Sequence, residues 1–233
     1  MHRNRLLLLA GAVAVAAIVV IVLIAAGSGG DSKSPNAPTT GSTTTALPSN
    51  PFAGVPQHGE TLGRADAAAT LTVFEDPQCP FCREWSLGTL PSVIQDFVRT
   101  GQVALVYRGI EIIGPNSQKG LRAIYAAGRQ NKLWNLSEAL YRRQGDENSG
   151  WITDAVIRDA AHAAGANADA ILAASGSAPV TNEWKQAEED AQTDAVQGTP
   201  AFIVQRPPAL PQTLNLPSLD VATFESALSA ALQ

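Results

Sequence analysis

The chain has 233 residues, of which 45% are hydrophobic and 16% are charged, and its formal net charge is −5. This composition supplies apolar material for one core of ordinary domain size rather than two. The mild acidity, without a basic stripe, excludes nucleic acid as the expected partner, because phosphate binding requires clustered Lys and Arg.

The N-terminal segment predicts a membrane anchor. Residues 1–5 (MHRNR) form a short basic tip, and residues 6–26 form an uncharged apolar run. That run matches the ~20 residues with which a helix crosses a bilayer and exceeds the roughly 7–15 apolar residues of a secretory signal. The small residues 25–28 would also suit cleavage, so a cleaved signal peptide is the alternative. By the positive-inside bias, the tip stays in the cytoplasm and the rest of the chain lies outside the cell membrane.

Residues 27–57 predict a flexible linker. They are dominated by Gly, Ser, Thr, Pro and Asn. Such a stretch cannot bury enough apolar area to offset the entropy lost on ordering. The folded domain is therefore expected over residues 58–233.

Strands and helices alternate through the predicted domain. Short β-rich apolar runs indicate buried strands, and apolar residues at spacings of three and four indicate helices. Pro91 is expected to kink the first helix, and Asp220 is expected to cap the last. The order is strand, helix, strand, helical region, strand and helix, at about residues 70–75, 80–100, 103–108, 118–194, 201–205 and 221–232.

Cys79 and Cys82 are the only cysteines, and they directly follow the first strand. A zinc site needs four ligands, which the isolated His2, His58 and His162 do not supply, so no metal is expected. A structural disulfide over two intervening residues would close a very small loop and would constrain the unfolded chain weakly. The third chemistry of this spacing, a redox-active pair, is favoured.

The position of the pair on a helix gives the two thiols different roles. Cys79 precedes Pro80 and the first helical turn, where unpaired N–H groups and the helix dipole stabilise a thiolate. Cys79 is therefore expected to be the nucleophile. Cys82, one turn inside the helix, is less exposed and close enough to resolve a mixed disulfide.

Two motifs carry a family resemblance. The stretch GRADAAATLTVFEDPQCPFCREW, followed much later by GTPAF, resembles the DsbA-like branch of the thioredoxin superfamily, from about residue 60 to the C-terminus. The resemblance implies an α/β thioredoxin-like fold interrupted by an all-helical insert at about 115–197. In this chain that fold would follow a transmembrane helix and a flexible linker. It also implies disulfide exchange through Cys79 and Cys82 with no further cofactor.

The resemblance also assigns roles around the cysteines. Pro80 and Phe81 would tune the redox couple, Pro200 would be a cis-proline, and Thr199 would offer backbone hydrogen bonds to an extended substrate. The chain departs from DsbA itself, which has a His at the position of Phe81. DsbA also has a buried acid six residues before the nucleophile, where this chain has Val73, while Asp76 resembles an Asp of the related DsbG and DsbC sequences. These departures predict a milder oxidant.

The expected function is that of a membrane-anchored, extracytoplasmic thiol-disulfide oxidoreductase that forms disulfides in exported proteins. By resemblance, an integral-membrane, quinone-linked partner would reoxidise it, and the chain is expected to be monomeric. One alternative is a reductase or isomerase of exported proteins. Another is a non-catalytic module that captures peptides, although the intact Cys79 and Cys82 pair argues against it.

Overall fold

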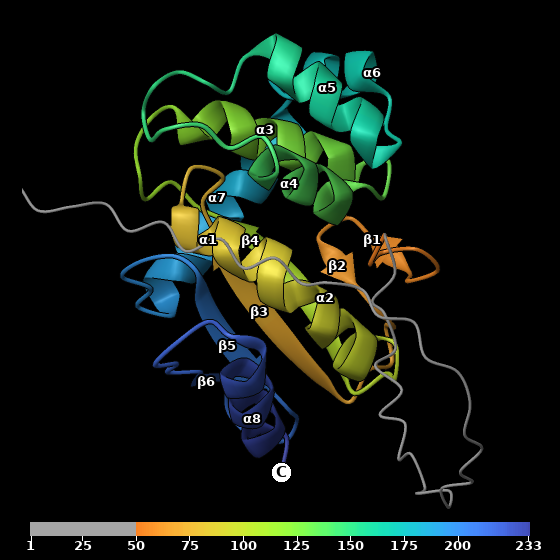
Figure 1. Cartoon of the computed structure of the whole chain (residues 1–233), viewed down its shortest axis with the longest axis vertical. Coiled ribbons are helices and arrows are strands. Elements are labelled where there is room, and N and C mark those ends of the chain that lie inside the picture. Colours follow the sequence, from red (N-terminus) through yellow and green to blue (C-terminus); the bar gives the residue numbers. More distant parts are fainter. Residues whose placement is uncertain (1–49) are drawn as a thin grey trace, which may run out of the picture. The chain divides into compact units, whose positions relative to one another are not determined.

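A mixed sheet organises the computed structural model, which describes residues 50–233 (Figure 1). The described strands are β1 (Gln57–His58), β2 (Thr61–Leu62), β3 (Ala69–Glu75), β4 (Val103–Gly109), β5 (Ala201–Gln205) and β6 (Gln212–Thr213). Their order is β1-β2-β4-β3-β5-β6, with β3 parallel to β4 and antiparallel to β5. The three predicted strands are the central ones, and the two-residue strands β1, β2 and β6 had no sequence signal.

Strand β3 positions the cysteines. Its side chains Leu71, Val73 and Phe74 are fully buried, as expected for a strand that is paired on both sides and covered on both faces. The chain leaves its carboxyl end at Glu75 and reaches Cys79 after a short loop. The carboxyl ends of central strands are common places for functional sites in α/β proteins, because the loops that follow them meet there.

The helix that follows the cysteine loop alternates between α and π geometry. Its segments are α1 (Pro80–Glu84), η1 (Trp85–Thr89), α2 (Leu90–Val93) and η2 (Ile94–Val98). Pro91 has no N–H and its ring crowds the preceding turn, and the π-helical turn η1 lies directly before α2. The predicted break at Pro91 is therefore present as a local change of helix type.

A helical insert lies between β4 and β5, as predicted. It contains α3 (Ser117–Gly128), α4 (Leu133–Tyr141), α5 (Asp154–Ala164), α6 (Ala168–Ala174) and α7 (Ala178–Thr193). Thr153 caps α5 by accepting the N–H of Val156, and Gly165 ends it in the left-handed conformation that glycine adopts without strain. Helices α3 to α6 are stacked beyond one end of the sheet (Figure 1), and α7 packs against β4 and α3.

The last helix, α8 (Val221–Ala231), closes the core beside the helix of the cysteines. Asp220 caps it by accepting the N–H of Thr223, as predicted. The rings of Trp85, Phe202 and Phe224 come from η1, β5 and α8, and their centroids lie 4.8 to 5.9 Å apart. Tilted aromatic contacts of this kind add to the burial of apolar area, so they fix the cysteine helix to the sheet and to α8.

The predicted boundary between linker and domain at residue 57 is wrong. Residues 50–57 belong to the folded domain: Phe52 is 3% exposed and lies in the main hydrophobic core. Arg99 donates hydrogen bonds to the backbone carbonyls of Pro51 and Ala53. His58, at which the predicted domain begins, lies in strand β1. The local composition resembles a linker, but one buried aromatic ring and a distant arginine hold the segment in place.

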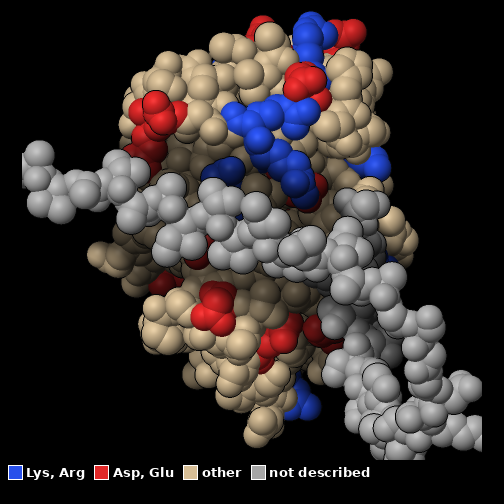
Figure 2. Space-filling model, viewed as in Figure 1, with Lys and Arg blue, Asp and Glu red and all other residues tan. Residues whose placement is uncertain are grey.

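Lys and Arg side chains gather over the insert on the face shown in Figure 2. Several arginines of the insert are in ion pairs with neighbouring carboxylates. These pairs are Arg142–Glu138, Arg143–Asp159, Arg158–Asp169 and Arg129–Glu183. Because at least one partner of each pair is exposed to solvent, these pairs contribute little to stability. Their main effect is local neutralisation of charge.

The predicted anchor (6–26), the tip before it and most of the predicted linker lie outside the described residues. Within residues 50–233, no helix has the length and apolar character needed to span a membrane.

Candidate active site at Cys79 and Cys82

Cys79 ends the loop after β3 and caps α1. Its sulfur accepts the backbone N–H of Cys82 at 3.4 Å, and its thiol donates to the backbone carbonyl of Thr199 at 3.1 Å. Both cysteines are free thiols in this structure. The contact with Thr199 joins residues 120 positions apart. The structure thus brings the predicted cysteine pair together with the predicted proline loop.

The surroundings of Cys79 lower its pKa to about 6. The largest cause is a hydrogen bond from the Cys82 thiol, which outweighs the opposing effect of burial. The hydroxyl of Thr199 and the backbone N–H groups of Phe81 and Cys82 lower the pKa further. That hydroxyl has no partner within residues 50–233 while Cys79 is a thiol, so it is free to donate to the thiolate. The sequence argument assigned most of this stabilisation to N–H groups, and the structure adds two side chains.

Cys82 has the opposite character. It is fully buried, in a small apolar cluster with Cys79 and Tyr141. Burial raises the pKa of its thiol well above the usual value, and the hydrogen bond to Cys79 and the nearby Glu75 raise it further. The pair therefore combines one thiol that ionises readily with one that stays protonated.

The other predicted site residues surround the pair. Pro80 occupies the first turn of α1, and Phe81 is 61% exposed, with its side chain toward solvent. The peptide bond between Thr199 and Pro200 is cis, as predicted. All six predicted residues therefore lie in one region, although Phe81 contacts the sulfur only through its backbone.

Glu75 is a site residue that the sequence argument missed. Val73, at the position where DsbA has its buried acid, is a core residue, but Glu75 is 1% exposed at the end of the same strand. Burial raises the pKa of Glu75 to about 8, and the charge of Cys79 raises it as well. One carboxyl oxygen receives a long hydrogen bond from Ser137, and the other has no partner within residues 50–233. The signal available in the sequence for this site residue was an acidic residue at the end of a strongly apolar strand.

Asp76 has a different task. Its fully buried carboxylate accepts four hydrogen bonds, from the backbone N–H groups of Gln78, Ile112 and Ile113 and from the hydroxyl of Ser117. These bonds tie the cysteine loop to the segment after β4 and to the start of α3. Three of the four bonds come from other segments and the fourth comes from within the loop, so Asp76 shapes the loop on which Cys79 stands.

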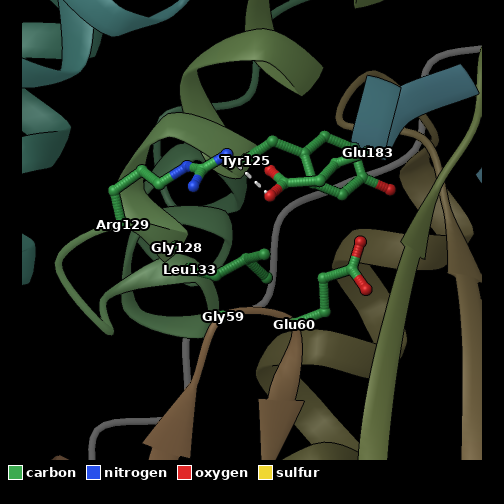
Figure 3. Close-up of a pocket in the computed structure, with 7 residues that line it drawn as sticks. All are labelled: Gly59, Glu60, Tyr125, Gly128, Arg129, Leu133 and Glu183. Atoms are coloured by element: carbon green, nitrogen blue, oxygen red, sulfur yellow. Dashed lines mark hydrogen bonds and ion pairs between the residues drawn. The ribbon is translucent and has the colours of Figure 1, made fainter. Parts of the chain in front are cut away.

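A separate hollow of about 300 Å³ lies between the β1–β2 hairpin and the insert (Figure 3). Glu60, Tyr125, Arg129 and Glu183 line it, and Arg129 donates to Glu183 across it. Burial raises the pKa of Glu60, although Arg108 pairs with its carboxylate at 2.5 Å. None of the lining residues belongs to the cysteine loop or to the Thr199–Pro200 loop. Among residues 50–233, no three His, Cys, Asp or Glu side chains are grouped as metal ligands.

Comparison with known families and curated proteins agrees with this geometry. A family model described as "Thioredoxin" matches residues 57–207. The chain is 30% identical over 100 residues to the probable disulfide bond formation protein D of Bacillus cereus, across 42% of this chain and 46% of the relative. It is 26% identical over 102 residues to the disulfide bond formation protein D of Bacillus subtilis, across 43% and 46%. The chain thus matches about half the length of these curated relatives.

Solved structures share the fold. The oxidised BdbD from Bacillus subtilis superposes with a TM-score of 0.64 and 19% identity, over 76% of this chain and 97% of that chain. DsbA from Chlamydia trachomatis superposes with a TM-score of 0.60 and 20% identity, over 75% and 90%. At these identities the likeness is one of fold.

Proposed function

Because this chain belongs to the thioredoxin family, we propose that it is a thiol-disulfide oxidoreductase that forms disulfides in exported proteins through its Cys79-Pro-Phe-Cys82 centre. The observation that carries the proposal is the placement of the two thiols: Cys79 caps α1 beside the Thr199 carbonyl, which goes with a lowered pKa, and Cys82 is fully buried, which goes with a raised one. The names of the curated relatives, disulfide bond formation proteins, support the same direction of chemistry.

The reaction begins from the disulfide between Cys79 and Cys82. A client thiolate attacks the sulfur of Cys79, the bond between the two cysteines breaks, and Cys82 leaves with the electron pair. A second client thiolate then attacks the client sulfur of the mixed disulfide and releases Cys79 as a thiolate. The client loses two electrons and gains a disulfide, and the protein is reduced to the dithiol. Cys79 is a good leaving group because a thiol of low pKa leaves fastest.

Glu75 supplies a proton at the step in which Cys82 leaves. The released sulfur is fully buried, and a thiolate there is unfavourable, so it must be protonated as it forms. Burial keeps the Glu75 carboxyl protonated to high pH, and its interaction with Cys82 places it close enough to matter for that thiol. In the reverse direction the same carboxylate accepts the proton.

The loop of Thr199 and Pro200 forms the binding edge for the client in this proposal. The carbonyl of Thr199 accepts a hydrogen bond from the Cys79 thiol. When Cys79 is in a disulfide it has no hydrogen to donate, so that carbonyl becomes free to accept a backbone N–H of the client. An extended client strand would then lie beside Cys79, with Pro80 and Phe81 setting the redox balance from the other side.

The cellular setting is also part of the proposal. Residues 6–26 anchor the chain in the cell membrane with the tip inside and the domain outside, and a quinone-linked integral-membrane protein reoxidises the dithiol. The apolar length and flanking charges of that segment support this arrangement. The protein acts as a monomer and needs no further cofactor.

The purified domain, oxidised beforehand, tests the proposal against a reduced, unfolded client that regains activity only when its disulfides form. We expect client oxidation coupled to the appearance of free thiols in the domain, and none with Cys79→Ala. Equilibration with glutathione then determines the direction. A reduction potential well below that of thioredoxin, about −270 mV, would instead identify a reductase.

A further inference from the structure

The backbone of the cysteine loop is held by a side chain of the insert. Gln144 follows α4, and its side-chain amide donates hydrogen bonds to the backbone carbonyls of Pro77 and Cys79, both at 3.0 Å. These two carbonyls lie on either side of Gln78. One half-buried amide therefore fixes two peptide planes, the one between Pro77 and Gln78 and the one between Cys79 and Pro80, directly after the nucleophile.

The position of the Cys79 carbonyl is coupled to the position of its sulfur. The same carbonyl accepts the N–H of Arg83 at 3.2 Å and begins the hydrogen bonding of α1. The sulfur accepts the N–H of Cys82 at 3.4 Å, an ordinary distance for a sulfur acceptor. A small rotation about the Cys79 backbone would change this distance, so whatever fixes that backbone also sets how well the sulfur is stabilised.

The connection after α4 holds the loop at a second point, which has no direct link to the sulfur. The backbone N–H of Asn148 donates to the side chain of the buried Gln78 at 2.8 Å. The side-chain amide of Asn148 donates to the backbone carbonyl of Ile113 at 3.1 Å. These contacts keep the loop attached to the insert without Gln144. The bond from Gln144 to Cys79 is thus separable from the general attachment of the insert.

We propose that Gln144 is a positioning residue for Cys79, through which the helical insert sets the reactivity of the nucleophile. The inference rests on the proposed function in taking Cys79 as the attacking thiol. The Gln144 amide hydrogen-bonds to backbone carbonyls and not to the sulfur, and it acts by holding the Cys79 carbonyl so that the sulfur meets the N–H groups of α1.

The chain offers a matched control in Gln130. It is half-buried, lies in the insert, and joins two segments through two hydrogen bonds to Asn167. Neither of these hydrogen bonds involves the cysteine loop. Gln144→Met and Gln130→Met each remove one amide and retain an apolar chain of similar length. The titratable groups beside Cys79, namely Glu75, Cys82 and Tyr141, are unchanged in both variants.

The test is the rate of iodoacetamide alkylation of the reduced full chain from pH 4 to 9, with thermal unfolding as a check on folding. For Gln144→Met we expect the pH profile of Cys79 to move upward by about half a pKa unit, so that the rate at pH 5 falls roughly threefold while the rate at pH 9 is unchanged. Gln130→Met should keep the original profile. An unchanged profile in a folded Gln144→Met protein would overturn the inference.

Two further outcomes are decisive. If Gln144→Met does not fold, Gln144→Ala, which leaves room for water at the two carbonyls, is measured in its place with the same expectation. Alkylation requires only the Cys79 thiolate and no client. A shifted profile in a protein that never oxidises a client would therefore leave the positioning role standing and remove the proposed function.

Discussion

The residues around the sulfur atoms of Cys79 and Cys82 give the two thiols opposite properties. Cys79 has a lowered pKa, and Cys82 is buried with a raised pKa. With a pKa of about 6, Cys79 is ionised in roughly nine-tenths of the molecules at neutral pH, while Cys82 stays protonated. Because the thiolate is the attacking species, Cys79 is the reactive thiol of the pair.

This division predicts different defects for the two cysteine variants. Cys79→Ser is expected to abolish exchange. Cys82→Ser leaves a thiol that can still attack but cannot be released by its neighbour, so it should accumulate mixed disulfides with clients. Non-reducing electrophoresis after incubation with an oxidised client measures the adducts. The opposite pattern would reverse the assignment of nucleophile and resolving thiol.

Phe81 is the residue at which this chain departs from DsbA next to the nucleophile. Its ring is exposed and gives the thiolate no hydrogen bond, whereas a His at this position could donate one or carry a positive charge. We expect Phe81→His to lower the Cys79 pKa and to raise the reduction potential by tens of millivolts, since ~30 mV corresponds to about 1.4 kcal/mol, the value of one charge-assisted hydrogen bond.

Titration of thiolate absorbance and equilibration with glutathione measure both quantities on the same protein. Phe81→Leu serves as the matched control, because it changes the shape of the side chain without adding a donor or a charge. A potential that is unchanged or lowered in the His variant would show that position 81 does not govern the redox balance.

The buried carboxyl of Glu75 makes stability depend on pH. Its pKa is about 8 in the folded protein against 4.5 for an exposed glutamate. The folded state therefore keeps the proton to a higher pH than the unfolded state, and this group destabilises the fold progressively as the pH rises from about 4.5 to about 8. The loss over this window amounts to a few kcal/mol, at most about 5.

Glu75→Gln should remove this loss. Urea unfolding of the reduced protein at pH 5 and at pH 8 gives the free energy of unfolding. We expect the difference in this free energy, variant minus parent, to be larger at pH 8 than at pH 5. Cys79 titrates in both proteins, so its contribution largely cancels in the comparison. An equal difference at both pH values would mean that Glu75 is ionised in the fold.

At the scale of elements, the strand, the helix and the insert converge on one loop. Strand β3 delivers the cysteine loop to the carboxyl edge of the sheet, α1 supplies N–H groups, and the insert adds Tyr141, whose hydroxyl donates to the carbonyl of Asp76. The insert is therefore part of the site. No periodicity in the insert indicates this, because the contacts come from side chains at helix ends and in loops.

The segment before β1 is an element that composition alone assigned to the linker. Phe52 is almost fully buried in the core, so Phe52→Ala should lower the free energy of unfolding by about 3 kcal/mol. Urea denaturation of the domain measures this, and Leu210→Ala, at a site 84% exposed, is the control with little expected effect. A neutral Phe52→Ala would mean that the segment contributes nothing to stability and would restore the predicted boundary.

At the scale of the whole chain, the apolar segment before the domain leads to a prediction of location. The apolar run 6–26 predicts that the mature protein fractionates with membranes and that its cysteines react with reagents that cannot cross the membrane. Cell fractionation and sequencing of the mature N-terminus measure this. A soluble form that starts near Gly27 or Ser28 would refute the anchor and leave the thiol chemistry unaffected.

The sequence by itself predicted the redox-active cysteine pair and the order of the longer elements. Both depend on short-range patterns: two cysteines one helical turn apart behind an apolar strand, and a Thr-Pro pair directly before another strand. Only the tertiary structure decided which distant groups act on the thiols. Thr199 reaches Cys79 across 120 positions, Glu75 acquires its high pKa from burial, and Gln144 binds the Cys79 carbonyl from the insert. Burial and long-range hydrogen bonds arise from packing, which leaves no periodic trace in the residues that take part.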